Sequence, residues 1–158
     1  MENIWVYVGI FLDELSKRKL KRLYPTPVDW KEYYDHMTVV YNDDTDLAKA
    51  IKSFNDHNIG KTFKLKVVSV GMSDKAFAVY VELPQCIVCA NKIAHITLAC
   101  SPEGNAVDSN YIPNWSNLSE PFEVKGTMKI FWPNLFGVSV TNGKNIEEAN
   151  VIYSNVNV

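Results

Sequence analysis

Two short segments of the sequence repeat a pattern of residues that can perform acid–base chemistry. His36 is followed two places later by Thr38 in HMTVV, and His95 is followed by Thr97 in HITLA. Both segments continue with aliphatic or β-branched residues, which is typical of strands. Side chains along a strand alternate between its two faces, so each histidine shares a face with its threonine. The sequence therefore predicts two strands that each present an imidazole and a hydroxyl together.

A pair of imidazoles can cleave a phosphodiester without a metal ion. One neutral ring acts as general base and one protonated ring as general acid near neutral pH. The two threonine hydroxyls can donate hydrogen bonds to an oxyanion as charge develops on it. One isolated His-x-Thr is usually no more than a polar residue at the end of a strand. The repeat favours function, so His36, Thr38, His95 and Thr97 are the predicted catalytic residues.

The order of apolar patterns predicts an α+β sheet protein with a single domain over residues 1–141. Residues 142–158 form an asparagine-rich tail whose course the pattern does not predict. Strands are expected at 4–12, 36–41, 95–100, 122–132 and 135–141, a hairpin at 62–84, helices within 13–24 and 43–60, and a polar loop at 101–120.

The two motifs, with a helix and a hairpin between them, resemble the two-histidine phosphoesterase superfamily, also called LigT-like. The resemblance extends from about Tyr7 to Phe136. It implies two pseudo-symmetric βαβ-type lobes that form a cleft, each lobe contributing one motif. It also implies metal-independent cleavage of 2′,3′-cyclic phosphates or small phosphodiesters. His36 and His95 would be the acid–base pair, and the motif threonines would donate to phosphate oxygens. The short distance between the motifs implies a trimmed second lobe.

The first motif, HMTVVY, also resembles that of phage anti-CBASS enzymes, which destroy cyclic nucleotide alarm signals. The first hypothesis is therefore a phosphodiesterase that cleaves small cyclic or linear oligonucleotide signals, as in viral evasion of nucleotide-based immunity. An alternative is a 2′,3′-cyclic phosphodiesterase of RNA end processing. A second alternative is a non-catalytic RNA- or nucleotide-binding module on the same fold.

Several aromatic residues can stack on a nucleobase, and stacking needs no basic groove. Two of them share one face of the first strand, one ends the first motif, and two lie in or beside expected loops. Each ring taken singly is more often part of a core. The predicted substrate-binding residues are Tyr7, Phe11, Tyr41, Trp115 and Trp132.

The cysteines around the second motif offer a competing interpretation. Cys86, Cys89, His95 and Cys100 approach the spacing of a zinc knuckle, which would indicate a nucleic-acid-binding module. The spacers lack the glycine-bearing turns that wrap four ligands around one ion. In a strand, residues five apart also face opposite sides, so His95 and Cys100 would not share a metal. Buried, inert cysteines are favoured, and no metal or cofactor is expected.

The composition limits the partners. The net charge of −2 provides no general electrostatic footprint for long nucleic acids, so no long duplex is expected. The expected partner is a cyclic or short oligonucleotide, or an RNA end with a cyclic phosphate. No signal peptide and no run of eighteen apolar residues are recognised, so no membrane association and a cytoplasmic location are expected, in the host cytoplasm if the protein is viral.

We expect turnover of a phosphodiester substrate to survive chelation by EDTA. No acidic cluster with ligand spacing accompanies the two histidines, so protonated imidazole and hydroxyls must balance the developing charge. The measurement is the initial rate with and without EDTA. Activity that disappears in EDTA and returns with zinc or magnesium would contradict this prediction.

Overall fold

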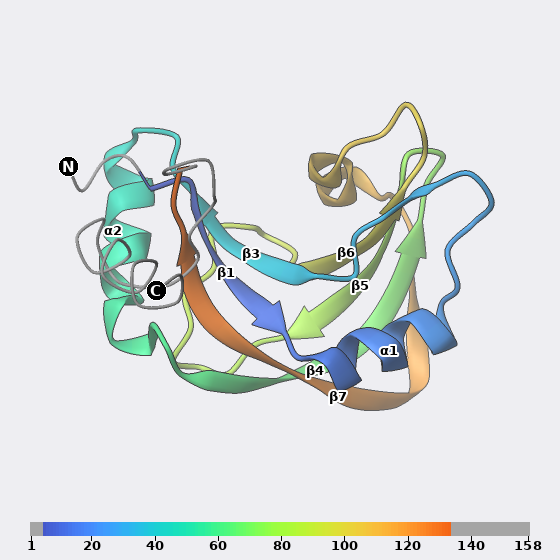
Figure 1. Cartoon of the computed structure of the whole chain (residues 1–158), viewed down its shortest axis with the longest axis horizontal. Helices are drawn as coiled ribbons and strands as arrows, with labels where there is room; N and C mark the ends of the chain where they lie inside the picture. Colours follow the sequence, from blue (N-terminus) through green and yellow to red (C-terminus); the bar gives the residue numbers. More distant parts are fainter. Residues whose placement is uncertain (1–4, 134–158) are drawn as a thin grey trace, which may run out of the picture.

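Six strands pair edge to edge until the last meets the first (Figure 1). In the computed structural model, which describes residues 5–133, their order is β6–β3–β1–β7–β4–β5, and β5 pairs back with β6. All of these pairs are antiparallel. The strands are β1 (Tyr7–Leu12), β3 (His36–Tyr41), β4 (Thr62–Met72), β5 (Ala76–Glu82), β6 (His95–Cys100) and β7 (Trp115–Phe131), with a two-residue β2 (Lys31–Glu32) paired to β6.

Within residues 5–133, two α-helices and two short 3-10 helices connect the strands. They are α1 (Glu14–Leu23), α2 (Asp46–Phe54), η2 (Asp56–Asn58) and η3 (Ala106–Tyr111). Each α-helix begins at a side chain that accepts a hydrogen bond from its first turn, Asp13 from the Ser16 amide and Thr45 from the Ala48 amide. The predicted helices in 13–24 and 43–60, the hairpin and both motif strands are thus confirmed.

The interior of the barrel is filled by one face of every strand. These residues alternate along the strands with outward-facing ones, and they form one apolar cluster. The cluster includes Val8, Ile10, Met37, Val39, Leu65, Val67, Val79, Val81, Ile96, Leu98, Val124, Met128 and Ile130. Burial of this face fixes the register, because a slip by one residue would turn each apolar side chain outward. The motif histidines and threonines therefore have a defined orientation on the outer face.

The expected arrangement of two βαβ-type lobes is wrong. A βαβ unit needs parallel strands, whereas every strand pair in the described part of the chain is antiparallel. The strands close into a single antiparallel barrel, so the two motifs belong to one sheet and not to two lobes. None of the described helices is long and apolar enough to cross a membrane.

The prediction of a polar loop at 101–120 is also wrong. This stretch contains η3 and the first six residues of β7, which continues past Pro121 as a strand of 17 residues. The polar stretch that follows Trp115 is a strand because it pairs with the end of β4, where Gly71 lies opposite Trp115. The strand expected at 135–141 and the tail at 142–158 lie outside the described residues.

Candidate active site

The two His-x-Thr motifs lie side by side on neighbouring strands. β3 and β6 run antiparallel with Met37 opposite Ile96, and both of these side chains are completely buried inside the barrel. The residues on either side of them, the motif histidines and threonines, therefore face outward. Because the strands run in opposite directions, the histidine of each motif lies toward the threonine of the other. One pair of strands thus brings together the four side chains that the repeat singled out.

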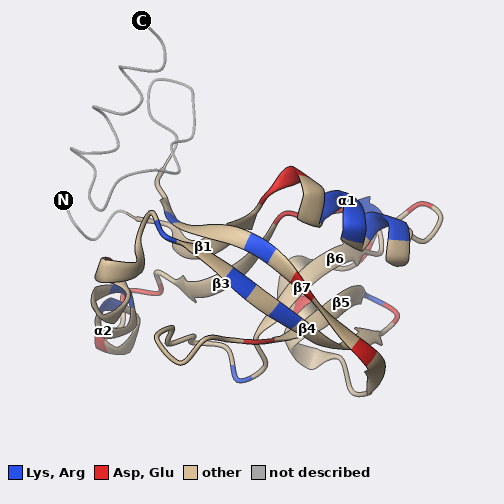
Figure 2. Cartoon of the chain, turned by 90° about the horizontal axis from the view of Figure 1, so that it is seen from below, with Lys and Arg blue, Asp and Glu red and all other residues tan. Residues whose placement is uncertain are grey.

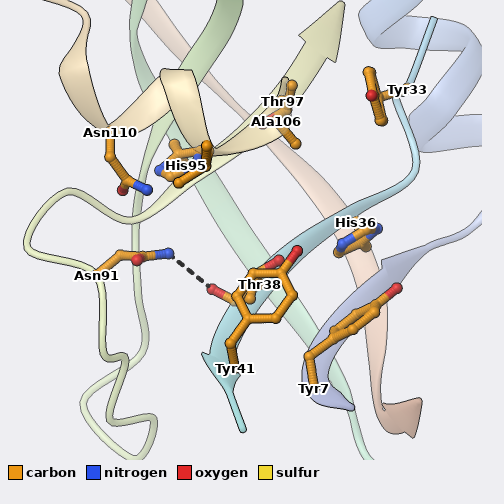
Figure 3. Close-up of a pocket in the computed structure, with 11 residues that line it drawn as sticks. Tyr7, Tyr33, His36, Thr38, Tyr41, Asn91, His95, Thr97, Ala106 and Asn110 are labelled. Atoms are coloured by element: carbon orange, nitrogen blue, oxygen red, sulfur yellow. Dashed lines mark hydrogen bonds between the residues drawn. The ribbon is translucent and has the colours of Figure 1, made fainter. Parts of the chain in front are cut away.

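These four side chains line one pocket of about 350 Å³ on the outside of the barrel. Figure 3 shows the motif residues of β3 and β6 around it, with Tyr7 and Tyr41 at one side and Asn110 of η3 at another. Asn91, from the segment between β5 and β6, also lines it and donates to the Thr38 carbonyl at 3.5 Å. The pocket is therefore built from residues far apart in the sequence.

His95 is buried, with 6% of its surface exposed. Its Nδ1 lies 2.8 Å from the carbonyl oxygen of Ile93. A carbonyl only accepts, so Nδ1 carries the hydrogen and Nε2 of the neutral ring is an acceptor. Burial lowers the pKa of His95; the Ile93 carbonyl opposes this shift, and the charge of His36 adds to it. His95 is thus suited to receive a proton.

His36 has a carboxylate beside it. Its Nδ1 lies 3.1 Å from Oδ2 of Asp35, and Oδ1 of Asp35 lies 3.3 Å from Lys17 Nζ. The hydrogen bond from His36 is the largest cause that holds the pKa of Asp35 below its usual range, and Lys17 contributes as well. Asp35 is therefore ionised and accepts from Nδ1, which leaves Nε2 of His36 for a substrate.

The ring of His36 packs on aromatic side chains of β1. Its centroid lies 5.0 Å from that of Tyr7 and 5.2 Å from that of Phe11, with interplanar angles of 22° and 29°. The rings fit because the residue between them on β1 is Gly9, where an added Cβ would lie 3.2 Å from Tyr7 and 3.4 Å from His36. Phe11 supports the histidine but does not line the pocket.

The two threonines have different surroundings. Thr97 is 8% exposed, and its hydroxyl lies 2.9 Å from that of Ser109, a completely buried residue of η3. Thr38 is half-buried and lines the pocket. If Ser109 donates its hydrogen to Thr97, the hydroxyl hydrogen of Thr97 remains available to a ligand.

The predicted substrate-binding rings do not all come together. Tyr7 and Tyr41 line the pocket with centroids 5.4 Å apart, and Tyr41 is 53% exposed. Burial raises the pKa of Tyr7, and Tyr41 and Asp35 add to this, so its hydroxyl stays protonated. Trp132 is completely buried in the core, and Trp115 packs in a second apolar cluster. Neither tryptophan lines the pocket.

The cysteines do not form a metal site with the motif. Cys86 is exposed, Cys89 is half-buried and Cys100 is buried. Within residues 5–133, no three His, Cys, Asp or Glu side chains lie close enough together to hold a metal ion.

The sequence profile described as "Fungal tRNA ligase phosphodiesterase domain" matches residues 15–135, which span both motifs and most of the chain. The chain belongs to this family. The family is of the two-histidine phosphoesterase type, so the resemblance inferred from the motifs is confirmed; the anti-CBASS detail is not supported.

A solved structure described as a fungal RNA kinase has the same fold. It matches with a TM-score of 0.59 at 16% sequence identity, over 78% of this chain and 44% of that one. This chain thus spans less than half the length of that protein. No curated protein sequence matches the chain.

In this member of the family, several residues around the pocket had not been predicted. Asp35 directly precedes the first histidine, and this adjacency was a usable signal. Ser109 and Asn110 lie in the stretch expected to be a loop, 12 or more residues from the second motif. Asn91 is one polar residue among the expected cysteine spacers. These last three reach the pocket through tertiary structure, and no local pattern predicts them.

We expect His95 to titrate below the usual histidine pKa of 6.5. Burial disfavours the charged ring, so it stays neutral as the pH falls past 6.5 and binds a proton only at lower pH. In that window the unfolded chain binds a proton that the native chain does not, so the free energy of unfolding falls as the pH falls. The measurement is an NMR titration of the His95 Cε1 proton, with an unfolded peptide containing AHITL as reference. A native ring that titrates at or above the peptide value would contradict the assignment.

Proposed function

We propose that this protein hydrolyses the 2′,3′-cyclic phosphate at the end of an RNA strand by metal-independent acid–base catalysis. One observation carries the proposal: in a member of a phosphodiesterase domain family, β3 and β6 place both motif histidines and both motif threonines around one pocket. The surroundings of the two histidines support different roles for them.

His95 is the general base in this mechanism. Its ring is neutral near pH 7 because of its lowered pKa, and Nε2 is the acceptor because Nδ1 donates to Ile93. Nε2 removes a proton from a water molecule, whose oxygen attacks the phosphorus and forms a new P–O bond. One ribose oxygen then leaves as its P–O bond breaks.

His36 is the general acid, since the leaving ribose oxygen needs a proton from a second group. Asp35 accepts from Nδ1 of His36 and so directs Nε2, which carries the transferred proton, toward the substrate. Lys17 holds the carboxylate of Asp35 in place. The products are one phosphomonoester and one free hydroxyl on the ribose. At the end of the reaction His36 has given one proton to the leaving oxygen, and His95 has received one from the attacking water.

The threonine hydroxyls stabilise the charge that develops on the phosphate. Thr97 donates to a phosphate oxygen while it accepts from Ser109. Thr38 donates from the other strand of the pair, so the phosphate lies between the two motifs. Both donors are fixed by strands, so little reorganisation is needed in the transition state.

Pocket size supports an RNA end as the substrate. A volume of about 350 Å³ lies at the lower end of the range for small-molecule sites, so it accommodates a terminal nucleotide better than a whole ring of nucleotides. In this proposal the base stacks on the ring of Tyr41, which is exposed and lines the pocket beside Tyr7. The family description also favours this substrate over the oligonucleotide signal that the first hypothesis named.

The test is hydrolysis of a synthetic RNA that ends in a 2′,3′-cyclic phosphate, followed by mass spectrometry, beside a panel of cyclic dinucleotides. We expect wild-type protein to add water to the RNA end. His36→Ala and His95→Ala should each lower turnover by roughly two to four orders of magnitude. Thr38→Ala and Thr97→Ala should lower it by about one to three orders. The matched control is His57→Ala, an exposed ring of η2 that does not line the pocket.

Each of the other possible outcomes would show which part of the proposal is wrong. Turnover of cyclic dinucleotides without turnover of the RNA end means that the substrate class is wrong. Binding of the RNA end without hydrolysis favours the non-catalytic module. Activity that survives loss of either motif histidine, or that His57→Ala abolishes, means that the reaction takes place elsewhere.

A further inference from the structure

Basic residues are concentrated on one helix of a chain whose net charge is −2. The sequence of α1, ELSKRKLKRL, has five Lys or Arg in ten residues. Two of them form ion pairs with acids near the pocket, Lys17 with Asp35 and Lys21 with Glu32. Figure 2 shows that α1 and basic positions on β7 and β4 occupy one side of the molecule. Positive charge is therefore distributed unevenly around the barrel.

A groove of about 310 Å³ lies between α1 and the strands β4 and β7. Three lysines line it, Lys19 from the helix, Lys64 from β4 and Lys125 from β7, together with the acids Asp13 and Glu123. Its shape is fixed because the backbone amide of Lys125 donates to the hydroxyl of Ser16 at 2.8 Å, which ties the helix to the strand. We call this the lysine groove.

The lysines of the groove are not neutralised by close ion pairs. Within residues 5–133, no carboxylate lies within 4.0 Å of the ammonium group of Lys19, Lys64 or Lys125. Lys64 lies directly opposite Lys125 in the ladder between β4 and β7. Like charges in directly opposite positions destabilise a sheet. A bound anion would remove this cost, so the arrangement favours an anionic ligand.

The outer face of β7 connects the lysine groove with the pocket. Lys125, Thr127 and Lys129 are two residues apart, so they lie on one face of the strand. Lys129 is paired with Gly9, the residue over which the His36 ring packs, and Lys125 is in the groove. Four strand residues span ~14 Å. A chain that leaves the pocket can thus follow β7 to the groove.

We propose that the lysine groove binds backbone phosphates of single-stranded RNA upstream of the end held in the pocket. This inference rests on the proposed function for its choice of ligand. Lysine suits the task because its ammonium is a point charge that binds phosphate without reading sequence. A single strand is favoured over a duplex because it can bend around the barrel from the pocket along β7 to Lys64 and Lys125.

The test measures binding separately from catalysis. A fluorescent single-stranded RNA of about twelve nucleotides, with an ordinary 3′-hydroxyl, is titrated with protein at several salt concentrations, and anisotropy gives Kd. The variants are Lys64→Glu and Lys125→Glu. The control with the same change in charge is Lys49→Glu on α2, at the opposite end of the molecule from α1 (Figure 1).

We expect each groove variant to raise Kd by roughly five- to tenfold relative to Lys49→Glu. The slope of log affinity against log salt should become shallower by about 0.7 for each phosphate that the variant no longer neutralises. Lys64→Glu places a glutamate opposite Lys125, so its thermal stability should be equal to or above that of wild type, whereas Lys125→Glu also brings a carboxylate near Asp13. Weaker binding in a protein that is no less stable cannot be attributed to misfolding.

The inference would be overturned by groove variants that bind as tightly as Lys49→Glu, or by a wild-type chain that does not bind this RNA. A poly-glutamate peptide that binds the groove as tightly as the RNA would also contradict it. A protein that binds RNA through the groove but leaves cyclic phosphate ends intact would contradict the proposed function alone.

Discussion

The pairing of β3 with β6, in which Met37 lies opposite Ile96, is the constraint on which the rest of the site depends. Both side chains are completely buried, so the pairing cannot slip by one residue without exposing them to water. This register turns the four motif side chains outward together and brings the two motifs into one pocket. The closed barrel protects the register, because β1 and β5 hold the two strands from either side.

Two chemically identical histidines acquire different properties from their surroundings. Burial keeps the ring of His95 neutral and the Ile93 carbonyl fixes its tautomer, whereas His36 lies against the ionised Asp35. When two ionisable groups lie in different environments, one can act as an acid and the other as a base at the same pH. The proposed lysine groove has a different role, because it would bind RNA and would take no part in proton transfer.

The sequence predicted local features well, because they depend on local patterns. The alternating pattern identified both motif strands, and the two α-helices lie within the ranges predicted for them, 13–24 and 43–60. How strands pair is not a local property, so the expected lobes were wrong. The polar residues after Trp115 gave no sign that they pair with β4. Ser109 reaches the hydroxyl of Thr97 only through the fold, and burial of Trp132 also follows from it. The two-residue period of a strand predicted that each histidine shares a face with its own threonine, whereas the meeting of the two motifs depended on the pairing of β3 with β6.

The central claim is that the two histidines act as one acid–base unit. A double-mutant cycle tests it most directly: single-turnover rates on RNA with a 2′,3′-cyclic phosphate end for wild type, His36→Ala, His95→Ala and the double variant. A reaction that needs both proton transfers is already abolished when one histidine is removed, so each single variant should be nearly as slow as the double variant. Rate reductions that multiply in the double variant would show that the histidines act independently, and would contradict the claim.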